Sequence, residues 1–249
     1  MQALRVEHDG ELLRVTLARP ERRNAFDAQL IAELTEAFSA VGDDVRAVLL
    51  SGDGPSFCAG ADVEWQRSSI DLTFEENVED ALRLHAMMAA VDSSPAPLVV
   101  RVQGHALGGG SGLVACGDVV VAAPDATFGF SEVRLGIIPA VISPFVFARI
   151  GAGRARPLFV TGDRFDAETA LRIGLVDEVA DDLDAAVDRH VAAILRSGPE
   201  ATRAAKRLTR ERPTEPRELA ETAAGLRAGA EGQEGLRAFL EKRRPNWSA

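Results

Sequence analysis

Two short stretches of small residues in this chain leave backbone amides available for chemistry. The first, FCAGAD at Phe57–Asp62, follows a buried apolar run and a Gly-Asp-Gly-Pro turn. Small residues let the backbone approach a ligand closely, with amide N–H groups pointing at it. The second, GHALGGGSG at Gly104–Gly112, opens into a short apolar helix that presents unpaired N-terminal amides. Both stretches predict a site for an anion or a developing oxyanion.

A third stretch, FGFSEVRLGIIP at Phe128–Pro139, places one acidic residue, Glu132, among apolar side chains. Burial there would raise the pKa of the Glu132 carboxyl toward the range useful for proton transfer. The competing interpretation is an ion pair between Glu132 and Arg134 or another arginine. The residues alone leave both interpretations open.

Other chemistries fit these stretches less well. The glycine turn is neither GxGxxG nor GK[ST], which disfavours a nicotinamide or ATP site. A GxSxG elbow is also missed, because Leu113 stands where its last glycine would be, so Ser111 is disfavoured as a nucleophile. Cys58 and Cys116 lack metal-ligand spacing, and we expect Cys58 to be a small buried hydrophobe. We expect His105 to be structural.

Short strands and helices must position these stretches. Alternating residues on both sides of Asp9-Gly10 predict a hairpin, and apolar spacing after Asn24 predicts a helix capped by Asp27. Near-continuous apolar runs suit a sheet that is covered on both faces. These runs are at Ala47–Gly52, Leu98–Gly104 and Asp118–Ala123. The predicted fold class is therefore α/β.

From Asp166 onward the pattern is helical, with breaks near Ser197-Gly198-Pro199 and Arg212-Pro213. We expect a core over residues 1–195 that holds the active site and a helical region over residues 196–249. One-sided helices need a surface to cover, either their own core or a neighbouring subunit.

Composition narrows the function classes. The 249 residues are 46% hydrophobic and 27% charged, which fits a globular chain. The net charge of -10 disfavours nucleic acid as a partner, because such binders neutralise phosphates with basic residues. No run approaches the roughly 20 apolar residues of a membrane span, and the N-terminus lacks the apolar core of a signal peptide. We expect a cytoplasmic protein without a membrane partner.

Taken in order, these stretches resemble the crotonase family of enoyl-CoA hydratases and isomerases over essentially the whole chain. Further matching stretches are Arg-Pro-(x)3-Asn-Ala at Arg19–Ala25, TGDRFDAETALRIGLVDEV at Thr161–Val179 and GLRAFLEKRRPNW at Gly235–Trp247. The resemblance implies a ββα spiral core with a C-terminal helical trimerisation region. It also implies a homo-oligomer, either a trimer or a hexamer built as a dimer of trimers.

The resemblance implies an acyl-CoA thioester substrate and no separate cofactor or metal, since coenzyme A is part of the substrate. The peptide amides of Ala61 and Gly109 would form the oxyanion hole for the thioester carbonyl, and Glu132 would transfer protons. Trp65 and the segment from Gln66 to Asn77 would cover the acyl pocket. The substrate-binding residues it implies are Arg22, Ala59, Asp62, Val63, Gly108, Phe239 and Lys242.

One position departs from the family pattern. Hydratases of the family typically carry two glutamates; the second matches Glu132, but the first aligns with Gly112. A single carboxylate suffices for the family's 3-enoyl to 2-enoyl isomerases, whereas Ser131–Phe147 looks more like hydratases of branched or glutaconyl-type enoyl-CoA. We expect a hydratase of a branched or medium-chain 2-enoyl-CoA. An isomerase, another enolate reaction of the family, a thioester hydrolase and an inactive CoA-binding or scaffold protein remain alternatives.

Overall fold

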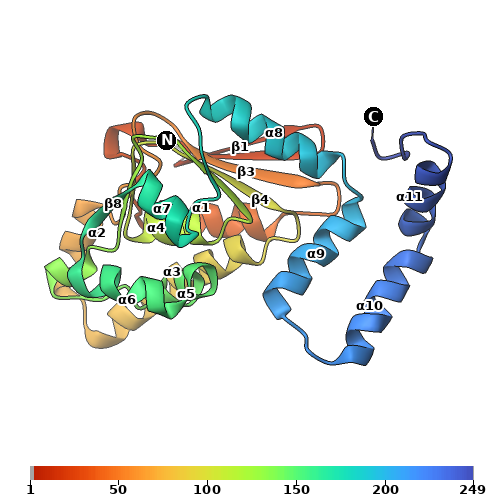
Figure 1. Cartoon of the computed structure of the whole chain (residues 1–249). Helices are drawn as coiled ribbons and strands as arrows, with labels where there is room; N and C mark the ends of the chain where they lie inside the picture. Colours follow the sequence, from red (N-terminus) through yellow and green to blue (C-terminus); the bar gives the residue numbers. More distant parts are fainter. Residues whose placement is uncertain (1–2, 249) are drawn as a thin grey trace.

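A six-stranded sheet forms the centre of this computed structural model, which describes residues 3–248 (Figure 1). The strand order is β1-β2-β3-β4-β6-β9, with β1 and β2 antiparallel and the other neighbours parallel. The predicted hairpin is confirmed, and Gly10 at its turn has a φ of 61°, a conformation that favours glycine. The strands are β1 (Leu4–Asp9), β2 (Leu12–Leu17), β3 (Ala47–Gly52), β4 (Leu98–Val102), β6 (Val119–Ala122) and β9 (Glu178–Val179).

Both faces of this sheet are covered, as the apolar runs predict. Val48 and Leu50 of β3 join the larger core together with residues of α1 (Ala28–Ser39) and α3 (Phe74–Asp92). The alternate residues Ala47 and Leu49 join a smaller core under α8 (Leu183–Leu195). Successive side chains of a strand point to opposite faces, so a strand buried on both faces must be apolar throughout.

A second, three-stranded sheet consists of β5 (His105–Leu107), β7 (Thr127–Gly129) and β8 (Arg164–Asp166), in that order. Strands β5 and β7 are parallel, with Leu107 opposite Gly129. Parallel strands that are in register end at the same edge of a sheet. The glycine turn after β5 and the Glu132 segment after β7 therefore leave the small sheet side by side.

The remaining helices surround these sheets. The helical tail is confirmed, with breaks where they were predicted, and α9 packs on the core through a buried lysine, Lys206, whose Nζ lies 2.7 Å from Asp118 Oδ2. Figure 1 shows α10 and α11 extending away from the two sheets. The helices are α2 (Val63–Ser68), α4 (Gly109–Ala115), α5 (Ser143–Ile150), α6 (Ala152–Thr161), α7 (Ala167–Ile173), α9 (Pro199–Glu211), α10 (Pro216–Ala228) and α11 (Ala230–Leu240), with short 3-10 helices at Pro20–Arg22, Ser69–Asp71 and Glu132–Leu135.

Candidate active site

Backbone hydrogen bonds hold the stretch around Ala61 between two other segments. On one side Phe26 N donates to Gly60 O (2.7 Å) and Asp62 N donates to Phe26 O (2.8 Å). On the other side Leu107 N donates to Cys58 O at 3.0 Å. Within residues 3–248 these bonds leave the amide of Ala61 without an acceptor. This free N–H is what the small residues of FCAGAD predict.

The buried side chain of Asn24 explains why the N-terminal loop reaches this stretch. Its Oδ1 accepts the Arg19 amide at 2.8 Å, and its Nδ2 donates to the carbonyls of Asp53 and Ser56, both at 2.9 Å. Asn24 therefore ties the loop to the turn that precedes FCAGAD, and Phe26 is placed against Gly60 as a result.

Gly109 begins helix α4, and no acceptor for its amide lies in the part of the chain that the structure describes. The preceding Gly108 has a φ of 52°, and its own amide donates to Gly129 O at 2.8 Å. A Cβ at Gly109 would lie 2.8 Å from Cε2 of the Phe26 ring. Only glycine fits this contact, so the backbone at position 109 packs directly against the Phe26 ring.

Glu132 is half-buried, just after β7. Burial raises the pKa of its carboxyl, and its Oε2 is buried without a hydrogen-bond partner among the described residues. The alternative of an ion pair with Arg134 is wrong, because Arg134 pairs with Asp163. Over residues 3–248 no other cation pairs with Glu132. The carboxyl is therefore free to accept and release a proton.

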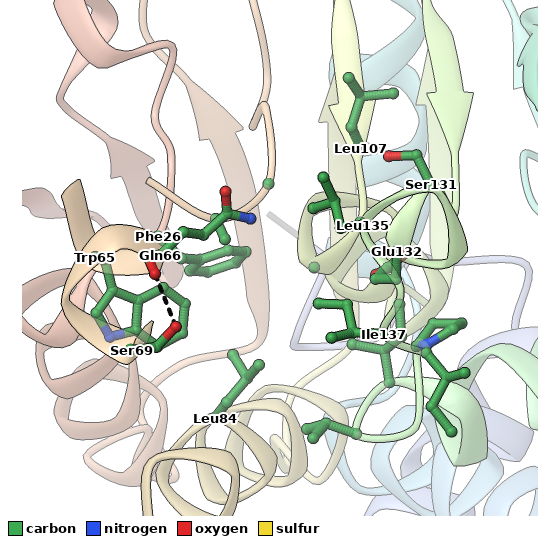
Figure 2. Close-up of a pocket in the computed structure, with 18 of the residues that line it drawn as sticks. Phe26, Trp65, Gln66, Ser69, Leu84, Leu107, Ser131, Glu132, Leu135 and Ile137 are labelled. Atoms are coloured by element: carbon green, nitrogen blue, oxygen red, sulfur yellow. Dashed lines mark hydrogen bonds between the residues drawn. The ribbon is translucent and has the colours of Figure 1, made fainter. Parts of the chain in front are cut away.

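These groups meet in one cavity of about 440 Å³. Figure 2 shows Trp65 and Ser69 on one side of it and Glu132 and Ile137 on the other. Of the segment predicted to cover the acyl pocket, Trp65, Gln66, Ser69 and Asn77 contribute to the wall, and their role as a cover stays a prediction. The predicted residues that line the cavity are Ala59, Ala61, Gly108, Gly109 and Glu132, and the remainder of the wall is largely apolar, with Leu84, Leu107, Leu135, Ile137, Ile138, Val141 and Ile142.

Tight packing around Gly112, which aligns with the first glutamate of the family's hydratases, leaves no room for a side chain. A Cβ at Gly112 would lie 2.7 Å from Ile142 Cγ2 and 3.0 Å from Met88 Cε. Both side chains are buried, so neither can turn into solvent. The wall of the cavity next to α4 is therefore apolar where a typical hydratase of the family has a carboxylate.

The other predicted binding residues do not line this cavity. Arg22 pairs with Asp62 at 3.3 Å, and the buried Asp62 carboxylate caps α2 by accepting the Glu64 amide at 2.9 Å. Val63 is exposed at the start of α2. Arg22 and Val63 thus lie near the stretch that carries Ala61, and contact between them and coenzyme A stays a prediction.

Phe239 lies near the end of α11 and Lys242 follows that helix, and neither lines the cavity of its own chain. Helix α11 extends away from the two sheets (Figure 1). The Phe239 side chain is 79% exposed, and Leu240 beside it is 77% exposed. A single chain does not bring these residues to the site. Their predicted contact with coenzyme A therefore requires a neighbouring subunit and stays a prediction.

Two charged residues of the cavity wall were missed by the sequence analysis, Asp80 on α3 and Arg164 on β8. For Asp80 a signal was present, because Asn77, Asp80 and Leu84 recur at helical spacing on one face of α3. Arg164 had no such signal, since β8 is only three residues long.

The residues judged structural behave as expected. Burial raises the pKa of the Cys58 thiol to about 12, so Cys58 is a buried hydrophobe. The buried Ser111 hydroxyl donates to Ala106 O at 2.6 Å, and neither Ser111 nor His105 lines the cavity.

No cluster that could hold a metal ion occurs among residues 3–248. None of the helices described is long and apolar enough to cross a membrane.

An α/β core in which two free amides and an unpaired, half-buried carboxyl share one cavity defines a protein that can bind a carbonyl and move protons beside it. Residues 7–249 match the family described as "Enoyl-CoA hydratase/isomerase", so this chain belongs to that family, the crotonases.

Individual relatives cover nearly the whole chain. It is 36% identical to the cyclohexa-1,5-dienecarbonyl-CoA hydratase of Thauera aromatica, over 97% of this chain and 95% of that protein. Among solved structures, AtuE of Pseudomonas aeruginosa superposes with a TM-score of 0.94 at 37% identity, covering 99% of this chain and 100% of that one. An enoyl-CoA hydratase of Shewanella pealeana gives 0.90 at 38% identity, covering 98% and 96%. The predicted crotonase fold is confirmed.

Proposed function

We propose that this chain is an enoyl-CoA hydratase that adds water across the 2,3 double bond of a branched or medium-chain 2-enoyl-CoA. The observation that carries the proposal is the Glu132 carboxyl, which is unpaired, half-buried and on the wall of a cavity that also holds two free amides. The hydratases among the relatives support this choice over other reactions of the family.

In the proposed mechanism, the amides of Ala61 and Gly109 donate hydrogen bonds to the thioester oxygen. The Glu132 carboxylate removes a proton from water while the water oxygen bonds to C3, and negative charge moves onto the thioester oxygen as an enolate. The two amides stabilise that charge, which is their largest contribution to the rate. The protonated Glu132 then returns its proton to C2, so that one carboxyl completes the addition of water.

The raised pKa of Glu132 supports this double role. A raised pKa makes the Glu132 carboxylate a stronger base toward water in the first step, and the proton that it takes up there is held for transfer to C2 in the second. With the apolar contact of Ile142 at Gly112, no side chain of α4 shares either step.

The closed position at Gly112 is also the observation that favours a second candidate, a 3-enoyl to 2-enoyl isomerase. There Glu132 would remove a proton from C2 and return it to C4, with the same enolate between the two steps. Water takes no part in that reaction, so it has no use for a second carboxylate.

An assay in water enriched in oxygen-18 separates the candidates. The purified protein is incubated with a 2-enoyl-CoA, a 3-enoyl-CoA and 3-methylglutaconyl-CoA, and the products are analysed by chromatography and mass spectrometry. A product that carries one labelled water supports the hydratase, whereas a double-bond shift without a change in mass supports the isomerase. Free CoA thiol would indicate a hydrolase, and no turnover with bound thioester would indicate a scaffold.

We also propose that the protein forms a homo-oligomer, a trimer or a hexamer. Large apolar side chains are exposed on the helical tail and on α3, and exposed apolar patches commonly mark interfaces. These side chains include Leu236, Phe239, Leu240, Phe74 and Leu82. Analytical ultracentrifugation tests this proposal, which a monomer at micromolar concentration would contradict.

A further inference from the structure

Positions along helix α3 show how far Asp80 lies from the two free amides. Met88 Cε lies 3.8 Å from the Cβ position of Gly109, so Met88 packs beside the residue whose amide would bind the thioester carbonyl. Asp80, which also lines the cavity, comes eight residues earlier, roughly 12 Å away along the helix axis. Side chains on a helix lean toward its N-terminus, which keeps Asp80 away from Gly109. Asp80 therefore stands far from the reacting C2 and C3 atoms.

The remote end of the cavity offers hydrogen-bond acceptors. The Asp80 side chain is only 18% exposed; its Oδ1 accepts from Arg83 at 2.9 Å, and its Oδ2 has no donor within residues 3–248. Nearby, Asn77 uses its Nδ2 to donate to the carbonyls of Leu72 and Thr73. The carbonyl oxygen of the Asn77 side chain accepts no hydrogen bond within residues 3–248, and Asn77 is part of the cavity wall.

Ser69 adds to the same property. Its hydroxyl donates to Gln66 O at 2.7 Å, so the lone pairs of its oxygen remain for a ligand. Figure 2 shows this bond on the side of the cavity opposite Glu132. Arg83, the cation that pairs with Asp80, is not part of the cavity wall. The cavity wall therefore offers hydrogen-bond acceptors at Ser69, Asn77 and Asp80, which would bind a ligand group that donates a hydrogen bond.

Building on the proposed function, we propose that Asp80 determines specificity and that the preferred 2-enoyl-CoA has an acyl chain ending in a hydroxyl group, which donates to the Asp80 carboxylate. A plain alkyl end would strip water from the carboxylate without replacing the lost hydrogen bond. A chain ending in a carboxylate would meet a like charge. A site built to bond a hydroxyl discriminates strongly against analogues that lack it.

The test compares three medium-chain 2-enoyl-CoA thioesters of equal length that end in a methyl group, a hydroxyl or a carboxylate. We expect wild type to prefer the hydroxyl over the methyl end by about tenfold to hundredfold in kcat/KM, the range of a hydrogen bond to a charged group. Asp80→Leu, which is similar in shape, should reverse that preference. Glu79→Leu, next to it on α3 but outside the cavity wall, should behave like wild type.

Asp80→Asn provides a milder variant, because it keeps the shape and one acceptor but loses the charge; it should lose only part of the preference. Equal loss on the methyl and hydroxyl substrates in both variants would overturn the proposal, since a merely structural role predicts that result. A wild-type preference for the carboxylate, abolished by Arg164→Gln, would also overturn it and assign recognition to Arg164. Failure of wild type to turn over these three thioesters and 3-methylglutaconyl-CoA would refute the proposed function itself, whereas turnover of the three thioesters without a preference refutes only this inference.

Discussion

Replacing Glu132 by glutamine removes the one unpaired carboxyl that residues 3–248 place near the two free amides, while keeping the size of the side chain. General acid or base catalysis typically contributes 10²- to 10⁴-fold. Because Gly112 supplies no second carboxylate, and Glu132 performs both proton transfers of the proposal, we expect a loss at the upper end, about 10⁴-fold in kcat. This corresponds to roughly 5.5 kcal/mol in the activation barrier.

The same substitution should leave folding and thioester binding intact. The amides of Ala61 and Gly109 belong to other segments, and neutral glutamine avoids the cost of burying a charge at position 132. The assay is steady-state hydration with a binding measurement on the same preparation, and Arg134→Gln, which breaks the exposed ion pair with Asp163, is the matched control. A Glu132→Gln variant that keeps kcat within tenfold of wild type would refute the assignment of Glu132.

Further predictions concern pH and packing. As pH falls through the raised pKa of Glu132, kcat/KM should fall because the base becomes protonated; an unchanged profile in the acid range would contradict this. The pKa of Glu132 is higher in the folded state than in the unfolded state, so its contribution to stability is complete below the unfolded pKa and is lost as pH rises through the folded pKa. Wild type should therefore lose stability relative to Glu132→Gln when denaturation is measured at increasing pH. Gly112→Ala should destabilise the fold by about 1–3 kcal/mol in urea, because its Cβ meets Ile142. The control Gly153→Ala, in α6 with no atom within 4 Å of the new Cβ, should be neutral or stabilising by about 0.5–1 kcal/mol, and equal effects of the two would show that Ile142 moves aside.

Local sequence properties made much of the site predictable. The small residues of FCAGAD and of the glycine turn are needed because the backbone itself is used there, and this requirement is visible in the residue types. The apolar neighbours of Glu132 made burial and a raised pKa one of two interpretations of its carboxyl, and burial in the structure agrees with that one. The hairpin at Asp9-Gly10 and the capped helix after Asp27 were equally local.

The tertiary structure decided what faces these groups. The sequence near Glu132 does not indicate that Arg134 pairs with Asp163, which follows helix α6. Because of that pair, Glu132 has no ion-pair partner in Arg134. The periodicity of α3 shows that Asp80 and Leu84 share a face, but only the packing of α3 against α1 and α4 turns that face toward the cavity. Residue types and local spacing thus determined which groups could do chemistry, whereas their partners, and the apolar closure at Gly112 by Ile142, depended on contacts between segments far apart in the sequence.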